Sequence, residues 1–209
     1  IGNHEKFDFM AAGIKHRVVI YGEGNHDVER LKKDMARICE ATTAVFGSNP
    51  NDDYLFIIHN TENGGGGLEH MNSTTLNVRR FSYEGSRYLG FLSLVAHEYF
   101  HLWNVKRLRP IELGPFDYDK ENYTSLLWVM EGFTSYYDEL LLRRANFYTK
   151  EQYLRDLFNT INSVENQPGN KIQPVAHASF DAWIKLYHPH ENSYNTTISY
   201  YSKGQLIGA

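Results

Sequence analysis

The sequence predicts an α+β fold in which two lobes, roughly residues 1–110 and 111–209, enclose a cleft. Three observations support this fold class. Short strand-like apolar runs fall early in the chain, and the apolar positions that repeat at helical spacing fall mostly late. The 209 residues, of which 42% are hydrophobic, are enough to bury a sizeable core.

The first lobe is expected to contain three strands and one helix before the long helices begin. Residues 17–21 form an apolar strand that ends at Gly22. A helix capped near Asn25 follows, because apolar residues then repeat every three or four positions as far as Gly47, which favours a helix end. Two further strands are expected at 54–58 and 73–81, and the glycine run at 64–67 between them reads as a flexible loop.

The second part of the chain is predicted to be helical. A helix over residues 88–104 is followed by a polar, proline-containing connection at 109–122 and by a second helix at 125–147. Thr149 and Gln152 make a capping box for a third helix over 150–163. Residues 166–195 read as an irregular surface segment, and a last helix opens near Tyr201.

The composition excludes several classes of protein. The net charge of −4 argues against nucleic acid as a partner, and no apolar run approaches the length of a membrane span. The single cysteine, Cys39, excludes an internal disulfide and a cysteine-based metal site, and its place in a helical repeat predicts burial. The compartment stays open, since the bacterial cytoplasm, the periplasm and secretion all fit this composition.

The segment His97-Glu98-Tyr99-Phe100-His101 reads H-E-x-x-H and lies in an apolar stretch with helical spacing. Residues four apart share one face of a helix, so both imidazoles can reach a single metal ion. Glu98 lies beside that face, where it can hold a water molecule. The pattern indicates a zinc hydrolase with Glu98 as the general base.

A catalytic zinc ion normally takes three protein ligands, so a third is needed. The metzincin pattern is excluded because Asn104 and Arg107 stand where that class has glycine and histidine. Two carboxylates remain as candidates. Glu121 lies in a polar segment where a solvated charge is expected, whereas Glu131 lies in an apolar helical face. Because a buried carboxylate needs a partner, Glu131 is the preferred ligand.

The flanks of the motif resemble one family. The segment from His97 to Pro110 is similar to the zinc motif and its extension in the glycyl aminopeptidase family of gluzincin peptidases, and residues 127–137 are similar to that family's third-ligand segment. The resemblance covers the chain from about residue 25 to its end. It implies a thermolysin-like catalytic domain with one zinc ion (Zn2+), held by His97, His101 and Glu131.

A third segment carries the resemblance further. Gly65-Gly66-Gly67-Leu68-Glu69-His70 is similar to the family's form of the exopeptidase motif, in which a glutamate pairs with the α-amino group of the substrate. The resemblance implies that Glu69 is this anchor. Gly66 and Gly67 would then let the substrate backbone lie close, as an added strand.

The predicted site also includes Tyr201 and Asp138, which come later in the chain. Tyr201-Ser202-Lys203-Gly204 is similar to the Tyr-x-Lys-Gly of aminopeptidase N relatives, which implies that the Tyr201 hydroxyl donates to the oxyanion, with adjacent Tyr200 as the alternative. Asp138 lies one heptad after Glu131 on the same helix face. It is expected to accept a hydrogen bond from a ligand histidine.

The resemblance implies a zinc-dependent aminopeptidase that acts on peptides with a free N-terminus and prefers Gly or Ala there. A thermolysin-like endopeptidase, in which Glu69 has no role, is one alternative. A peptide-binding module that has lost turnover is another. Members of the family carry a β-rich N-terminal domain and often a C-terminal PDZ domain, so residues 1–209 are expected to be the catalytic core of a longer chain. His59, His188 and His190 are expected to lie outside the site.

Overall fold

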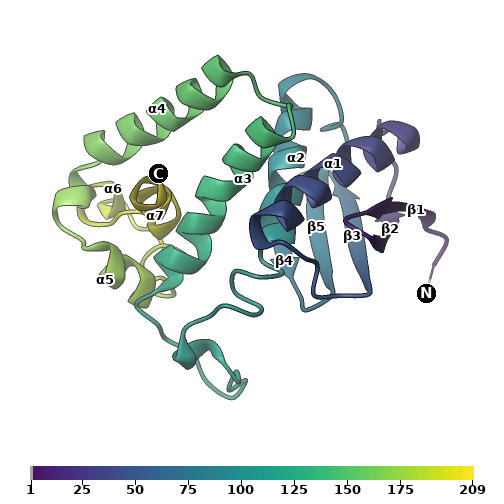
Figure 1. Cartoon of the computed structure of the whole chain (residues 1–209). Helices are drawn as coiled ribbons and strands as arrows, with labels where there is room; N and C mark the ends of the chain where they lie inside the picture. The colour runs from purple at the N-terminus through teal and green to yellow at the C-terminus, as the bar shows by residue number, and fades with distance from the viewer. Residues whose placement is uncertain (1) are drawn as a thin grey trace. The chain divides into compact units, whose positions relative to one another are not determined.

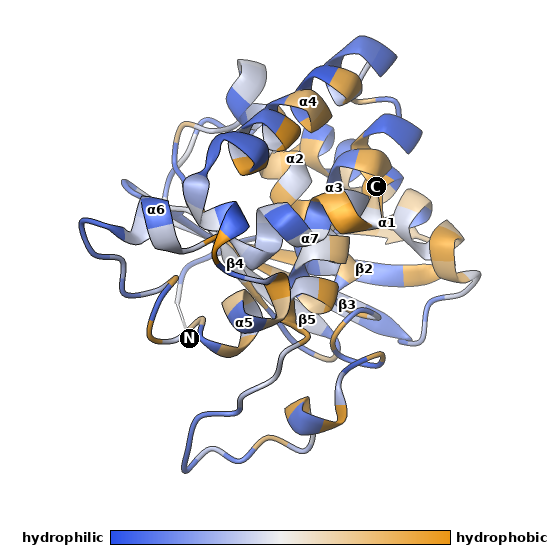
Figure 2. Cartoon of the chain, turned by 90° about the vertical axis from the view of Figure 1, so that its left-hand side faces the viewer, coloured by the Kyte–Doolittle hydropathy of each residue, from blue (hydrophilic) through white to orange (hydrophobic). Residues whose placement is uncertain are grey.

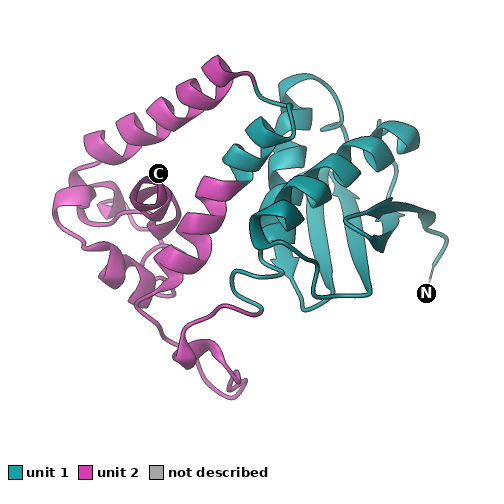
Figure 3. Ribbon diagram, in the orientation of Figure 1, with its two compact units in different colours: residues 1–106, 138–148 teal, residues 107–137, 149–209 magenta. Residues whose placement is uncertain are grey.

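The computed structural model describes residues 2–209 and contains a five-stranded sheet and a set of helices (Figure 1). The predicted α+β class is therefore confirmed. The chain forms two compact units, which Figure 3 colours separately. Unit 1 consists of residues 1–106 and 138–148, and unit 2 of residues 107–137 and 149–209. Helix α3 (Phe133–Arg144) contributes residues to both units.

Unit 1 is built on a mixed sheet with the strand order β1-β2-β3-β5-β4. Strands β2, β3 and β5 run parallel to one another, while β1 and β4 pair antiparallel at the two edges. The strands are β1 (Glu5–Ala11), β2 (Ile14–Tyr21), β3 (Asp53–Thr61), β4 (Gly67–Glu69) and β5 (Ser73–Arg79).

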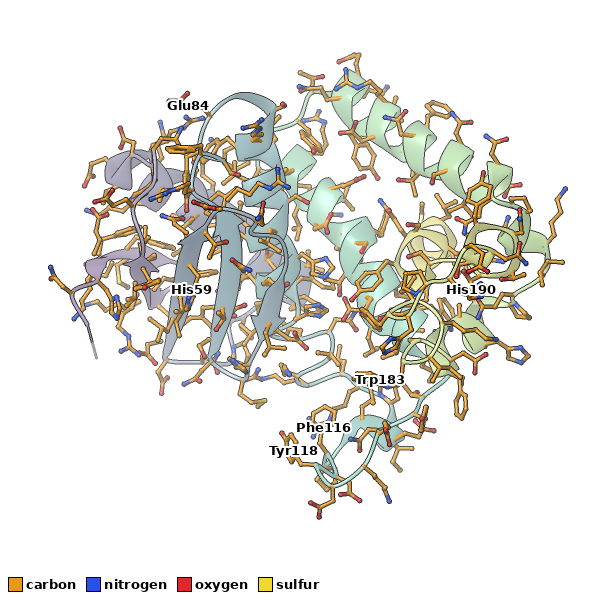
Figure 4. All side chains as sticks on the ribbon, turned by 180° about the vertical axis from the view of Figure 1, so that it is seen from behind. His59, Glu84, Phe116, Tyr118, Trp183 and His190 are labelled. Carbon is orange, nitrogen blue, oxygen red and sulfur yellow. The ribbon has the colours of Figure 1, made fainter. Side chains whose placement is uncertain are left out.

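One face of this sheet is buried and the other is more accessible. Val18 of β2, Phe56 of β3 and Leu76 of β5 are buried, and the residues between them along each strand are more exposed. This alternation is typical of a sheet that packs on one side only. Helices α1 (Val28–Phe46) and α2 (Gly85–Phe100) supply the packing on the buried side. Figure 4 shows unit 1 from the opposite side, with His59 labelled.

The sequence prediction for unit 1 needs three corrections. Strands β1 and β4 were not predicted, since β1 alternates charged and apolar residues and β4 begins in the glycine run that was expected to be a loop. Helix α1 is capped by Asp27, whose side chain accepts from the Arg30 backbone N–H at 2.9 Å, rather than near Asn25. The motif helix spans 85–100 rather than 88–104, and the chain turns directly after it. Gly47 ends α1 in a left-handed conformation, as predicted.

Unit 2 is helical and has a small core of its own. That core contains Val164, Ala178, Ala182, Ile198 and Tyr200. Its helical elements are η1 (Ile111–Leu113), η2 (Trp128–Gly132), α4 (Lys150–Asn166), η3 (Pro168–Lys171), α5 (Val175–Phe180), α6 (Ser193–Thr196) and α7 (Tyr200–Gly208). In Figure 2, α4 carries hydrophilic and hydrophobic residues in alternating bands, as an amphipathic helix does.

The structure corrects the prediction for unit 2 in two places. The expected helix at 125–147 is a π-helical segment, η2, that continues into α3 and ends at Arg144. The expected irregular segment at 166–195 contains the short helices η3, α5 and α6. The capping box of Thr149 and Gln152 is present, and α4 begins where it predicts. Within residues 2–209 no helix is both long enough and apolar enough to cross a membrane.

Candidate active site

The last turn of α2 carries His97 and Glu98, and His101 directly follows it. The helix forms here because its apolar side packs on the sheet, where Val95, Ala96 and Tyr99 are buried. The two imidazole rings lie with their centroids 4.8 Å apart and their planes at 84°. Glu98 and His101 are only 4% and 1% exposed. Because residues four apart share one face of a helix, both imidazole rings lie on the same side of α2.

Both imidazoles are held by their Nδ1 atoms. His97 Nδ1 donates to Asp138 Oδ2 at 2.9 Å, and His101 Nδ1 donates to the Asn104 carbonyl at 2.7 Å. A histidine that donates from Nδ1 presents Nε2 to a metal ion, and such orienting partners are characteristic of metal-binding histidines. Burial raises the pKa of Asp138, and the hydrogen bond from His97 acts in the opposite direction. The two Nε2 atoms of His97 and His101 are therefore suitable ligands for a zinc ion.

Strand β4 brings Glu69 and Gly67 to the motif within unit 1. Ligand atoms of Glu69, Glu98 and His101 all lie within 4.8 Å of one another. A Cβ atom on Gly67 would lie 2.5 Å from the Glu98 carboxyl carbon, so any side chain at this position would displace the carboxylate. Gly66 has a φ of +100°, a conformation that favours glycine. The glycine run thus lets the backbone lie directly against the candidate base.

A cation that sequence reasoning missed completes this cluster. Lys106 Nζ lies 3.4 Å from Glu69 Oε1, and both side chains are largely buried. The turn that delivers Lys106 contains Val105 at a φ of +152°, which is unusual for a β-branched residue and typical of strained functional segments. The same turn supplies the Asn104 carbonyl to His101. A signal was available, since Lys106 belongs to the motif's extension, but its partner is not evident from sequence.

In unit 2, Glu131 lies in the π-helical segment η2, a type of distortion that is frequent at functional sites. Helix α7 packs against η2 through Gly132 and Gly204, where a Cβ atom on Gly204 would lie 2.5 Å from the Trp128 carbonyl oxygen. This close approach brings Tyr201 near Glu131. Burial and the negative charge of Glu131 raise the pKa of Tyr201.

Two further tyrosines surround Tyr201. Tyr200 is buried, its ring stacks on that of Tyr201 at 4.6 Å, and burial raises its pKa. After burial, the charge of Glu131 is the largest cause of the raised pKa of Tyr201. For the raised pKa of Tyr200 the same charge is the smallest cause. Tyr187, which sequence reasoning missed, places its hydroxyl 2.9 Å from that of Tyr200 and 3.4 Å from that of Tyr201.

The competing metal ligands are less suitable. Glu121 is exposed in the polar connection of unit 2. His188 and His190 lie in an exposed loop, and Figure 4 labels His190 on the surface of that unit. Among residues 2–209, none of these three belongs to a group of three or more side chains whose ligand atoms could share a metal ion.

A mixed sheet, a packed motif helix and two oriented imidazoles define the class of H-E-x-x-H peptidase domains. The chain belongs to the M61 glycyl aminopeptidase family, whose profile matches residues 90–207, more than half of its length. It is also similar to the crystal structure of an aminopeptidase N family protein from Idiomarina loihiensis, with a TM-score of 0.94 and 41% identity. That similarity covers 99% of this chain but only 36% of the other. No curated protein matches the chain.

Proposed function

We propose that the protein is a zinc-dependent aminopeptidase, with one zinc ion held by His97, His101 and Glu131. Membership of the family and the two oriented imidazoles support this proposal. Glu131 is chosen over Glu121 because it lies in an apolar helical segment, where a carboxylate needs a partner, whereas Glu121 is exposed. Glu131 precedes Asp138 by seven residues in a helical segment that is unbroken from Trp128 to Arg144, and Asp138 is the partner of His97.

Each chain residue then has a defined task in peptide hydrolysis. When bound, zinc supplies a Lewis acid that polarises the scissile carbonyl and makes water a better nucleophile. Glu98 takes a proton from the attacking water and passes it to the departing amine. Tyr201 donates a hydrogen bond to the developing oxyanion, an interaction whose loss typically lowers turnover about a hundredfold or more.

The single observation that favours an aminopeptidase is the short separation of Glu69 and Glu98. Their carboxylate oxygens lie within 4.8 Å of each other. In an N-terminal residue the α-nitrogen and the scissile carbonyl carbon are about 2.5 Å apart, as standard backbone geometry requires. If Glu69 binds the α-ammonium and Glu98 serves the attack on the carbonyl, this spacing accommodates one residue between them. The register therefore matches the release of a single N-terminal residue.

The backbone around Glu69 is suited to an extended peptide. Strand β4 lies at the edge of the sheet, so one side of it has no neighbouring strand among the described residues. A peptide that adds to such an edge is held by main-chain hydrogen bonds. Gly66 directly precedes β4 and has no heavy atom within 4 Å of the position that a Cβ would take, so it leaves space for a substrate backbone, whereas Gly67 lies against Glu98. The preference for N-terminal Gly or Ala is part of the proposal and rests on the family resemblance.

Blocking the α-amine of the substrate tests the proposal. We expect the protein to hydrolyse Ala-p-nitroanilide and to lose at least a hundredfold in kcat/KM on the N-acetylated compound, because Glu69 then has no ammonium to bind. An internally quenched peptide with a blocked N-terminus serves as the endopeptidase substrate. Cleavage of that peptide, with no discrimination between the two anilides, would assign the protein to the endopeptidases instead.

A further inference from the structure

We infer that Lys106 is a positioning residue that holds the Glu69 carboxylate in place for the α-ammonium of the substrate. The inference deepens the proposed function and rests on Glu69 as the amine anchor. Lys106 Nζ lies 3.4 Å from Glu69 Oε1, and the two side chains are only 16% and 18% exposed. Because little solvent surrounds this pair, its attraction is screened less than that of an ion pair on the open surface.

Glu69 lies on a short edge strand, so its backbone alone does not define where the carboxylate points. Strand β4 has three residues and pairs with β5. A glutamate side chain has several rotatable bonds, and ordering them when a ligand binds costs conformational entropy. A neighbour that orders the carboxylate beforehand therefore strengthens binding. A carboxylate has two oxygens that each accept more than one hydrogen bond, so acceptor sites remain for the α-ammonium beside the Lys106 ammonium.

Lys106 is itself held by the turn that follows the motif helix. Its backbone N–H donates to the His101 carbonyl at 3.1 Å, and His101 Nδ1 donates to the Asn104 carbonyl of the same turn at 2.7 Å. The buried Trp103 ring stacks on Phe46 at the end of α1, with the ring centroids 4.5 Å apart. The turn therefore fixes both a proposed zinc ligand and the cation beside the proposed amine anchor.

Two other roles for Lys106 would give different kinetics. A lysine that bound the substrate itself would raise KM on removal whether or not Glu69 kept its charge. A lysine that only supported the turn would lower zinc binding and stability on removal, because the turn carries His101. A lysine that acts through Glu69 raises KM for a substrate with a free amine, leaves kcat unchanged and has no effect once the Glu69 carboxylate is gone.

Replacement of the lysine in two backgrounds tests the inference. Lys106→Met removes the charge and keeps an unbranched side chain, Lys106→Arg keeps a positive charge, and Lys106→Met is also combined with Glu69→Gln. Lys15→Met is the matched control, because Lys15 also pairs with a carboxylate of unit 1, that of Asp8, but both of those side chains are 54% exposed. The readouts are kcat and KM on Ala-p-nitroanilide, bound zinc and the thermal unfolding midpoint.

We expect Lys106→Met to raise KM about tenfold at the kcat, zinc content and unfolding midpoint of the wild type, and to cause no further rise in the Glu69→Gln background. Lys106→Arg should raise KM less than Lys106→Met. Wild-type KM in Lys106→Met, or an equal rise in Lys106→Arg or Lys15→Met, would overturn the inference. So would loss of zinc, a lowered midpoint or the same rise in the Glu69→Gln background. If Glu69→Gln alone keeps wild-type KM, Glu69 is not the amine anchor, and the failure lies in the proposed function.

Discussion

Lys106 Nζ lies 3.4 Å from Glu69 Oε1, so the carboxylate proposed to anchor the substrate already has a cationic neighbour. Glu98 lies close to the same carboxylate. A substrate α-ammonium bound at Glu69 would therefore share this carboxylate with the Lys106 ammonium.

Replacing Glu69 by Gln should remove this recognition. We expect KM for Ala-p-nitroanilide to rise about tenfold to a hundredfold, since a hydrogen bond to a charged group contributes about 1.5–3 kcal/mol. The zinc content should not change. Glu62→Gln, at an exposed position in the preceding loop, is the control. Unchanged kinetics in Glu69→Gln would mean that this residue does not bind the substrate.

Asp138→Asn should weaken zinc binding. Asp138 accepts the His97 Nδ1 hydrogen, and loss of such an orienting carboxylate typically lowers metal affinity tenfold to a hundredfold. Competition with a zinc chelator measures the change. Asp52→Asn, an exposed position of unit 1, provides the comparison and should bind zinc as the wild type does. Equal affinities in the two variants would remove Asp138 from the site.

Glu98→Gln should keep zinc and abolish hydrolysis. Glutamine preserves the size and position of the side chain but cannot take a proton from water. We expect kcat to fall at least a hundredfold, while zinc remains bound at one ion per chain. Appreciable residual turnover of Ala-p-nitroanilide in this variant would show that another group is the base.

The stability of the fold should fall below neutral pH because of His16. This residue is buried against the motif helix, with Nε2 2.8 Å from the Tyr99 hydroxyl, and burial lowers its pKa from 6.5 to about 4. The unfolded chain takes up this proton near pH 6.5 and the folded chain only near pH 4. Stability is therefore complete above pH 6.5 and decreases as the pH falls to 4, by about 3 kcal/mol.

Urea unfolding at pH 7 and pH 4.5 measures this effect. His16→Gln cannot titrate, so we expect the free energy of unfolding of this variant to change less between the two pH values than that of the wild type. The same change in both proteins would show that other groups cause the pH dependence.

Local signals predicted part of the molecule well. The capping box of Thr149 fixes the start of α4, and the i, i+4 spacing of His97 and His101 fixes their common side, because both follow from helix geometry alone. Strands β1 and β4 and the short helices between 166 and 195 were missed, since their stability depends on packing rather than on their own sequence patterns.

The same distinction applies to the site. The approach of Glu69 to Glu98 depends on the pairing of β4 with β5, which no short motif encodes. The position of Lys106 depends on the positive φ of Val105, and a valine in the sequence does not indicate such a backbone conformation. Tyr187 reaches Tyr201 from a segment that has no regular pattern. Contacts of this kind require the tertiary structure.

The central claim, that Glu131 completes a zinc site with His97 and His101, is tested most directly by titrating the metal-free protein with zinc. The wild type and Glu121→Ala should each bind one zinc ion with the same affinity. The zinc affinity of Glu131→Ala should fall by more than the tenfold to hundredfold that is typical when a residue hydrogen-bonded to a metal ligand is replaced. Wild-type affinity in Glu131→Ala, or a large loss in Glu121→Ala, would contradict the account.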